Sequence, residues 1–219
     1  MSTRERVIAH LADLIEGVRP RQRAIIAIDG VDGAGKTWLA DELRDALAAR
    51  REVHRVSIDG FHRPREQRYA RGRTPESFYL DSYDYAAFER VCVGPFRAGE
   101  PFVTGFWDVS TDAPAAANPK FAGPAALLIV DGIFLHRPHL RDLWDASVWV
   151  EVPFSVSVPR GNARFADLTP DLSDPESPTN RRYVDGQRRY LAEVAPAAYA
   201  TWVMDNTDLQ RPTVHSALR

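Results

Sequence analysis

Two patterns of apolar and polar positions alternate along this chain. Short unbroken apolar runs, typical of buried strands, are followed by longer segments in which apolar residues recur every three or four positions, typical of amphipathic helices. The predicted strands are residues 24–29, 53–58, 126–131, 147–152 and 201–204. The predicted helices are residues 1–20, 36–50, 83–96, 138–143, 155–165 and 181–194. This alternation predicts an α/β fold of three layers, in which helices flank a parallel sheet.

The first predicted helix has one apolar face. Val7, Leu11 and Ile15 recur at helical spacing. Ser2 and Glu5 have the spacing of a capping box, which indicates a helix start. The segment is therefore an amphipathic helix rather than a signal peptide. No apolar run approaches the ~20 residues that a membrane-spanning helix needs, so we expect a cytoplasmic protein with no membrane partner.

Composition narrows the class of protein further. The chain has 219 residues, of which 44% are hydrophobic and 26% charged, and this fits one compact domain over residues 1–219. Its net charge of −2 gives no reason to expect a nucleic-acid partner. The single cysteine, Cys92, excludes an internal disulfide and a zinc site built from cysteines. Because its neighbours are apolar, we expect a buried thiol.

Two loop regions interrupt the pattern. Residues 111–124 are rich in alanine and proline, which predicts a surface connection. Residues 168–180 are rich in proline, aspartate and serine and are flanked by arginines. That segment is a candidate mobile lid, and with the end of the preceding helix the lid covers about residues 160–180.

A phosphate-binding motif follows the first predicted strand. The run Gly30-Val31-Asp32-Gly33-Ala34-Gly35-Lys36-Thr37 matches G-x-x-x-x-G-K-[ST] and opens a predicted helix. The glycines let backbone N–H groups approach a triphosphate, Lys36 is suited to reach its β- and γ-phosphates, and the Thr37 hydroxyl is suited to ligate Mg²⁺. The predicted nucleotide contacts are Gly30, Asp32, Gly33, Ala34, Gly35, Lys36, Thr37 and Trp38.

Carboxylates end two of the other predicted strands. Asp59 ends the second strand, where it could accept a proton from an attacking hydroxyl and face the Mg²⁺ ion. We expect the strand order to put this tip beside the phosphate loop, at the sheet edge that holds ligands. The alternative is that Asp59 and Gly60 only form a turn. Asp131 follows the apolar run 127–130 and is a second candidate for supporting the metal.

Taken in order, these motifs resemble the uridine kinase, phosphoribulokinase and pantothenate kinase group. The segments that carry the resemblance are Ile28-Asp29-Gly30 to Thr37, Ser57 to His62, Val130 to Ile133, Arg160 with Arg164, and Asp205 to Asp208, and they span roughly residues 23 to 210. The resemblance implies a P-loop NTPase fold that binds ATP through Lys36 and Thr37. It also implies that Asp59 is the general base and that Arg160 and Arg164, on a lid helix, contact the transferred phosphate.

The lid helix departs from the usual pattern of that group. Pro159 and Gly161 interrupt it, so the helix either begins later than residue 155 or bends there. The spacing of Arg160 and Arg164 places both on one helix face, where they could point at the same phosphates. The alternative is a solvated helix face.

The resemblance also supplies candidates for the acceptor site. Uridine kinases use an aromatic, histidine and aspartate set, which implies that Phe61, His62, Tyr79 and Asp84 contact the substrate. The segment from Arg181 to Gln187 resembles the return of the chain to the active site in that group, which adds Arg182 and Gln187 as candidates. A structural hydrogen bond is an equal alternative for His62. The run Pro75-Glu76-Ser77-Phe78 instead resembles pantothenate kinase relatives.

The expected activity is transfer of the γ-phosphoryl group of ATP, with Mg²⁺, to a hydroxyl of a small metabolite. The 5′-hydroxyl of uridine or cytidine is the favoured acceptor, and pantothenate, nicotinamide riboside or a sugar are alternatives. A non-catalytic nucleotide-binding module is a further alternative. The sequence leaves open whether GTP can replace ATP and whether the chain forms a homo-oligomer.

Overall fold

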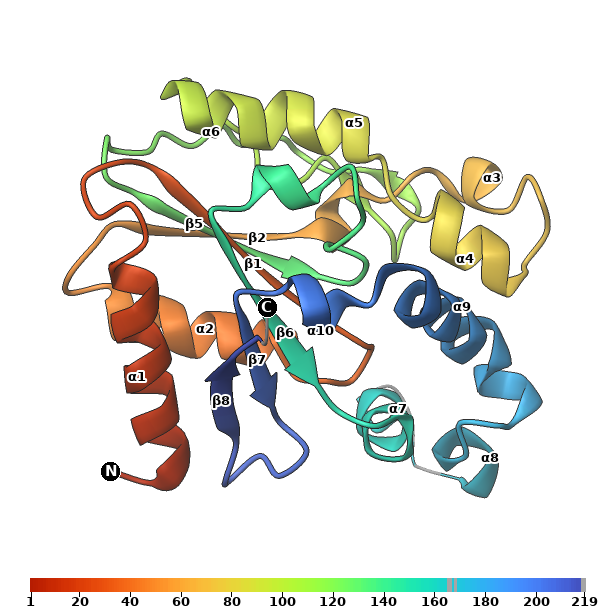
Figure 1. The fold of residues 1–219 in the computed structure, drawn as a ribbon. Coiled ribbons are helices and arrows are strands. Elements are labelled where there is room, and N and C mark those ends of the chain that lie inside the picture. Colours follow the sequence, from red (N-terminus) through yellow and green to blue (C-terminus); the bar gives the residue numbers. More distant parts are fainter. Residues whose placement is uncertain (165–166, 168, 218–219) are drawn as a thin grey trace.

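The fold is built on a six-stranded sheet with the order β2-β5-β1-β6-β7-β8 (Figure 1). The computed structural model describes residues 1–164, 167 and 169–217. The strands are β1 (Ala24–Gly30), β2 (Val53–Ser57), β5 (Leu127–Gly132), β6 (Ala146–Glu151), β7 (Trp202–Asp205) and β8 (Thr213–Ser216). Neighbouring strands are parallel except for β7 and β8. The predicted α/β fold with a parallel sheet is therefore confirmed.

Helices cover both faces of the sheet (Figure 1). On one face α1 (Thr3–Glu16) packs on α2 (Lys36–Leu47), which contacts β1, β2 and β5. The other face carries a continuous helix made of α5 (Tyr85–Phe88), a π-helical turn (Glu89–Val93) and α6 (Gly94–Ala98). The remaining helices are α3 (Arg65–Arg68), α4 (Pro75–Asp81), α7 (Phe154–Asn162), α8 (Pro170–Ser173), α9 (Pro178–Val194) and α10 (Pro196–Tyr199). A short hairpin pairs β3 (Trp107–Asp108) with β4 (Ala113–Pro114).

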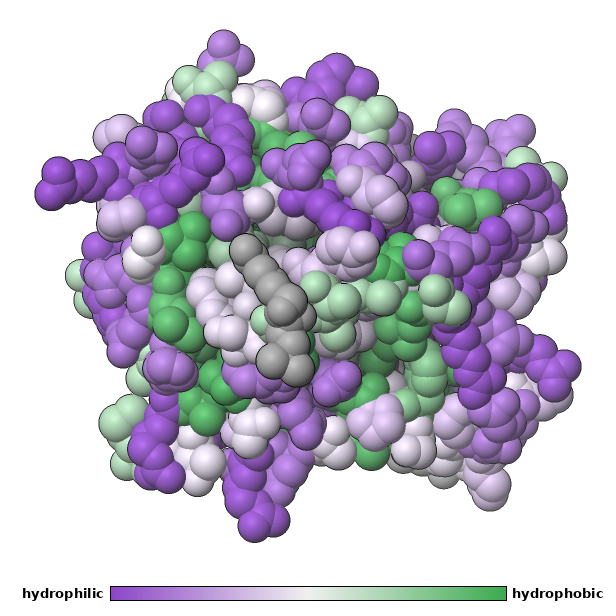
Figure 2. All heavy atoms as spheres, in the orientation of Figure 1, coloured by the Kyte–Doolittle hydropathy of each residue, from purple (hydrophilic) through white to green (hydrophobic). Residues whose placement is uncertain are grey.

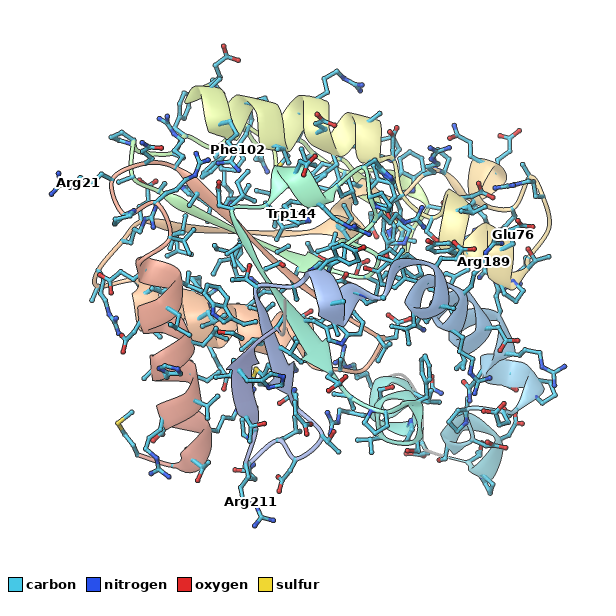
Figure 3. The ribbon with its side chains drawn as sticks, viewed as in Figure 1. Arg21, Glu76, Phe102, Trp144, Arg189 and Arg211 are labelled. Atoms are coloured by element: carbon cyan, nitrogen blue, oxygen red, sulfur yellow. The ribbon has the colours of Figure 1, made fainter. Side chains whose placement is uncertain are left out.

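The core consists of the central strands and the aromatic layer under α5 and α6. Every residue of β1 and β5 is buried. Phe102 packs edge-on against Phe96, and Trp144 lies near Phe88, all beneath this helical layer (Figure 3). Cys92 is buried as predicted, and burial raises the pKa of its thiol to about 12. Figure 2 shows hydrophilic residues around the rim of one face and hydrophobic patches further in.

The N-terminal helix begins as the sequence predicts. The Ser2 hydroxyl accepts a hydrogen bond from the Glu5 backbone N–H at 3.1 Å, and the Glu5 carboxylate accepts one from the Ser2 N–H at 2.7 Å. This capping box satisfies two backbone donors that the helix leaves unpaired. No helix in the described ranges is long and apolar enough to cross a membrane.

The sequence analysis missed one strand and misassigned one helix. The tip of β2 does lie beside the phosphate loop as predicted: β5 stands between β2 and β1, but Asp59 after β2 lines one cavity with Lys36. The polar, mostly exposed strand β8 was missed, since its short sequence lacks an apolar run. The predicted helix 138–143 is only a 3₁₀ turn, Arg141–Leu143, in a loop held by hydrogen bonds from Arg141 Nε to His136 O and from Trp144 Nε1 to Leu135 O.

Two other predicted segments extend past the described residues. Residue 165, the end of the predicted helix 155–165, and residue 168, the start of the predicted lid loop, lie outside them. Within the described part, α7 contains Pro159 in its interior, so the helix does not begin later, as one alternative had it. Residues 111–124 are mostly exposed, in agreement with the predicted surface connection.

A substitution at Gly30 would test how tightly the central strands are packed. A Cβ added there would lie 2.7 Å from the Val150 carbonyl oxygen of β6. We expect Gly30→Ala to lower the free energy of unfolding by about 1–3 kcal/mol, as overpacking does. Gly17→Ala is the control, because Gly17 already has helical φ and an added Cβ would make only ordinary contacts. Urea denaturation curves of both variants measure the difference, and equal midpoints would contradict this account.

Candidate functional site

The phosphate loop joins the buried end of β1 to the first residue of α2. Gly33 and Gly35 have φ of 75° and 92°, a left-handed conformation that favours glycine. Lys36 and Thr37 form the first turn of α2, so unpaired N–H groups of the helix face the loop. The Lys36 ammonium donates a hydrogen bond to the Val31 carbonyl at 2.8 Å. The loop therefore combines a positive charge with the concave backbone that an anion requires.

The glycines of the loop also serve packing, which the motif alone does not indicate. A Cβ on Gly33 would collide with the carbonyl of Ser157 on α7, and a Cβ on Gly35 would lie 2.8 Å from Asn206 Nδ2. Gly161 of α7 lies against Gly33 on the same side, with its backbone N 2.9 Å from the Cβ added to Gly33. Helix α7 thus rests directly on the phosphate loop.

Thr37 and Asp131 lie together, as a shared metal site requires. The Thr37 hydroxyl donates to Asp131 Oδ2 at 3.0 Å, and Arg55 Nη2 donates to Asp131 Oδ1 at 2.5 Å. Hydroxyl and carboxylate oxygens suit Mg²⁺, which usually keeps water and phosphate oxygens as its other ligands. No group of three or more His, Cys, Asp or Glu side chains that could hold a metal occurs within the described residues. The donors present fit an ion that is bound jointly with a nucleotide.

Asp59 lies in a 3₁₀ turn, Ile58–Phe61, that follows β2 directly. Its exposed carboxylate accepts a hydrogen bond from the Tyr83 hydroxyl at 2.9 Å. Burial, together with the negative charge of Asp59, raises the pKa of Tyr83 well above its ordinary value, so this phenol stays a donor. Close packing also favours a glycine at position 60, because an added Cβ would lie 2.9 Å from the Cα atom of Gly105.

One small cavity of about 80 Å³ brings three of the four predicted catalytic residues together, Asp59, Lys36 and Arg164, although β5 separates β2 from β1. Its lining residues include Asp32, Lys36, Thr37, Asp59, Asp131 and Arg164. A larger cavity of about 540 Å³ shares Asp32, Gly33, Asp59, Ile133 and Arg164 with it. The two cavities therefore adjoin, with Asp59 at their junction.

The larger cavity contains only some of the predicted acceptor contacts. His62 and Gln187 line it. The sequence analysis missed the other polar and aromatic lining residues, which include Phe78, Tyr83, Asn162, Asn180 and Tyr183. Phe78 could have been found from the sequence, because it belongs to the run Pro75-Glu76-Ser77-Phe78. Asn162 and Asn180 belong to no sequence motif that would have indicated them.

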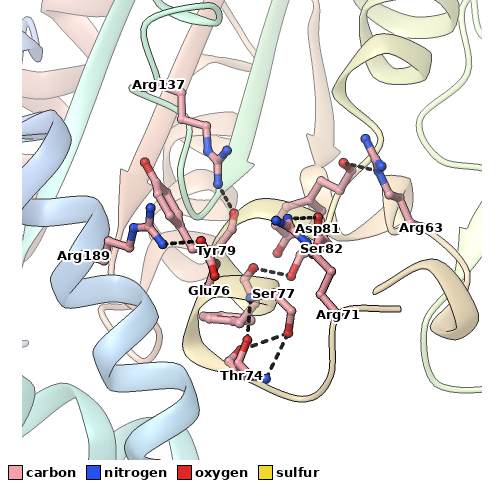
Figure 4. A network of polar contacts seen from close by, with 12 residues as sticks. Arg63, Arg71, Thr74, Glu76, Ser77, Tyr79, Asp81, Ser82, Arg137 and Arg189 are labelled. Carbon is pink, nitrogen blue, oxygen red and sulfur yellow. Dashed lines mark hydrogen bonds and ion pairs between the residues drawn. The ribbon is translucent and has the colours of Figure 1, made fainter. Parts of the chain in front are cut away.

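Four predicted acceptor contacts lie outside the lining of this cavity. Phe61 is fully buried against Phe88 and Phe106. Tyr79 lies under Arg137, whose guanidinium is 4.1 Å from its ring centroid and donates to its carbonyl (Figure 4). These two residues contribute to packing rather than to the site.

The other two are Asp84 and Arg182. Asp84 caps α5 by accepting a hydrogen bond from the Ala87 N–H at 2.9 Å. Arg182 stacks on Tyr69, Phe78 and Tyr183, beside the cavity rather than in its lining. Asp84 therefore has a structural role, and Arg182 supports an aromatic wall.

Gln187 ties α9 to the phosphate loop. Its Oε1 accepts from the Asp32 N–H at 2.6 Å, and its Nε2 donates to Asp32 Oδ2 at 3.3 Å and to the Tyr183 carbonyl at 3.0 Å. The Asp32 side chain is open to solvent at the cavity mouth, but the surrounding protein still desolvates its carboxylate and raises its pKa. Lys36 opposes this shift.

The two lid arginines do not share one helix face, contrary to the prediction. Arg160 donates to the carbonyls of Asn206 and Thr207 at 3.2 and 3.0 Å. Arg164 follows the end of α7 and lines both cavities. Burial and the positive charges of Arg4 and Arg164 lower the pKa of Arg160. Arg160 therefore fixes the segment after β7, and Arg164 alone faces the site.

Solved structures identify the architecture. No protein-family model and no curated protein sequence matches the chain. A possible uridine kinase from Bacillus stearothermophilus is 21% identical, with a TM-score of 0.72 over 90% of this chain and 97% of that one. A kinase assigned provisionally to a fructose transport system in Silicibacter sp. TM1040 is 26% identical, with a TM-score of 0.69 over 84% and 94% of the two chains. This is the fold of the P-loop small-molecule kinases.

A more distant P-loop kinase has the same fold. Phosphoribulokinase from Rhodobacter spheroides is 13% identical, with a TM-score of 0.55 over 84% of this chain and 70% of that one. The resemblance to this group of kinases is thus confirmed at the level of fold. The acceptor is not fixed by these comparisons.

A buried carboxylate anchors the P-loop at its first residue. Asp29 Oδ1 accepts from the Gly30 N–H at 2.8 Å, and Oδ2 accepts from the Tyr190 hydroxyl and from His136 Nδ1 at 2.5 and 2.8 Å. His136 Nε2 in turn lies 2.9 Å from Ser147 Oγ. This Asp-His-Ser series is fully enclosed, so it is a structural support rather than a nucleophile. Asp29 precedes the phosphate-binding motif in the sequence, but its anchoring role depends on His136 and Tyr190, which are distant from it in the chain.

His62, which lines the larger cavity, predicts a measurable pH dependence of stability. Burial lowers the pKa of His62 below its ordinary 6.5, although its hydrogen bond to the Asp59 carbonyl opposes the shift. The unfolded chain then binds the proton more readily, so folding loses stability as the pH falls below about 6.5. We expect wild type to lose more unfolding free energy than His62→Gln between about pH 7.5 and about pH 5. Urea titrations at both pH values measure this, and equal losses would refute it.

Proposed function

We propose that this protein is an ATP-dependent kinase that transfers the γ-phosphoryl group of ATP to a hydroxyl of a small metabolite, with the 5′-hydroxyl of uridine or cytidine as acceptor. The observation that carries the proposal is the position of Asp59 at the junction of the two cavities. One of them contains Lys36 and Thr37 of the P-loop, and the other is a larger space with aromatic walls.

Each group at this junction has a chemical role in the proposal. Asp59 accepts the proton of the attacking hydroxyl, and the Tyr83 phenol orients its carboxylate. Lys36 and Arg164 stabilise the charge of the phosphoryl group in transfer. Thr37, supported by Asp131, would hold Mg²⁺, which would neutralise negative charge on the phosphates.

The acceptor cavity suits an uncharged molecule with a flat ring and several hydroxyls. Phe78, Tyr83 and Tyr183 provide aromatic faces, and Asn162, Asn180 and Gln187 provide amide groups for hydrogen bonds.

Charge in the same lining favours a nucleoside over an acidic acceptor. Asp32 and Asp59 contribute carboxylates, whereas Arg164 is the one arginine or lysine among the described lining residues. A carboxylate acceptor such as pantothenate would meet like charges there, which disfavours it.

Asp59 and Lys36 give the sharpest test of the proposed chemistry. We expect Asp59→Asn to keep ATP affinity and to lower kcat about 10²- to 10⁴-fold, the usual contribution of a general base. Lys36→Ala should retain the circular dichroism of wild type and lose turnover. Steady-state assays of ADP release with uridine measure both. A near-normal kcat for Asp59→Asn would eliminate it as the base.

An acceptor panel separates the alternatives. We expect ATP consumption with uridine and cytidine to exceed that with pantothenate, whose carboxylate would meet Asp32 and Asp59, and that with sugars, which lack a flat ring. Nicotinamide riboside has a flat ring and a positive charge, so greater consumption with it than with uridine would identify that alternative as the acceptor. Chromatography of the products identifies any phosphorylated acceptor. Bound ATP without a phosphorylated product from any of them would instead support a non-catalytic nucleotide-binding module.

A further inference from the structure

A large aromatic side chain stands open beside the P-loop. Trp38 is the third residue of α2, and 70% of its surface is exposed. Its indole has no hydrogen-bond partner and no stacked ring among the described residues. Because tryptophan is mostly buried in folded proteins, its position next to a nucleotide site suggests a ligand contact.

The helix face that carries Trp38 points toward the segment after β7. Glu42 lies one turn further along α2 on that face, and its carboxylate accepts from Arg4 at 2.6 and 2.7 Å. Arg4 also donates to the Leu209 carbonyl at 3.1 Å and to Asn206 Oδ1 at 3.0 Å. The indole therefore extends on the side of α2 that faces residues 206–209.

Residues 206–209 form a firmly held wall next to the P-loop. Asn206 Nδ2 donates to the Ala34 carbonyl at 2.7 Å, and Arg160 holds the Asn206 and Thr207 carbonyls. Leu209 is 40% exposed at the end of this wall. Leu209 thus presents an exposed apolar side chain on this wall, as Trp38 does on α2.

The direction of a bound nucleotide follows from the position of the acceptor. A γ-phosphate that is to be transferred must lie toward Asp59 and Arg164, where the two cavities meet. The α-phosphate and nucleoside then extend the opposite way, past the first turn of α2. Side chains of a helix lean toward its N-terminus, so the Trp38 indole leans toward that path.

We propose that Trp38 is the stacking platform for the base of the donor nucleotide, with Leu209 at the other edge of the same space. This inference rests on the proposed kinase function and assigns the donor base a contact made through its face rather than its edge. Since every base has a π-face, the platform accepts adenine and guanine alike.

Calorimetric titration tests the platform directly. The probes are Mg²⁺ complexes of ATP, of GTP and of tripolyphosphate, which has the phosphates but no base. We expect Trp38→Ala to bind ATP and GTP about 10-fold more weakly, the scale of one lost base stack, and tripolyphosphate as wild type does. Trp38→Phe should restore most of the affinity. Phe121→Ala, which removes an aromatic side chain of equal exposure (71%) outside the site, should change nothing.

Two results would overturn the platform. Unchanged ATP affinity in Trp38→Ala would show that the indole does not touch the base. An equal loss for tripolyphosphate would show that the substitution disturbs the P-loop itself. If wild type bound neither ATP nor tripolyphosphate, the proposed kinase function would fall as well, so the two failures are distinguishable.

Discussion

The carboxylate of Asp29 holds together the three segments from which the candidate site is built. It accepts hydrogen bonds from the first residue of the P-loop, from His136 in the loop after β5, and from Tyr190 on α9. A buried carboxylate without such partners would cost several kcal/mol, so these segments cannot separate without a large penalty. Because α9 also carries Gln187, the same anchor positions the contact with Asp32.

The two parts of the candidate site differ in charge and polarity. Positive charge and backbone N–H groups gather at the P-loop, where Lys36 lies at the start of α2. Carboxylates and aromatic rings gather in the larger cavity, around Asp59 and Tyr83. Arg164 faces both cavities. This distribution of charge suits the proposed phosphoryl transfer, because the P-loop can hold the anionic phosphates and the larger cavity an uncharged compound with a hydroxyl group.

Helix α7 packs directly on the P-loop. Gly33 and Gly161 allow the two backbones to touch, and any side chain on Gly33 would collide with Ser157. Ser157 and Gly161 of α7 also line the larger cavity, so one helix borders both the P-loop and that cavity.

The sequence by itself determined the local features of this protein. A strand, a glycine loop and an amphipathic helix are encoded by neighbouring residues, so the P-loop, the capping box of Ser2 and the buried Cys92 followed from short-range patterns. Only the tertiary structure decided the strand order and the roles of Phe61, Asp84 and Arg160. The physical reason is that periodicity indicates which residues are buried, whereas their partners depend on packing between segments that lie far apart in the chain.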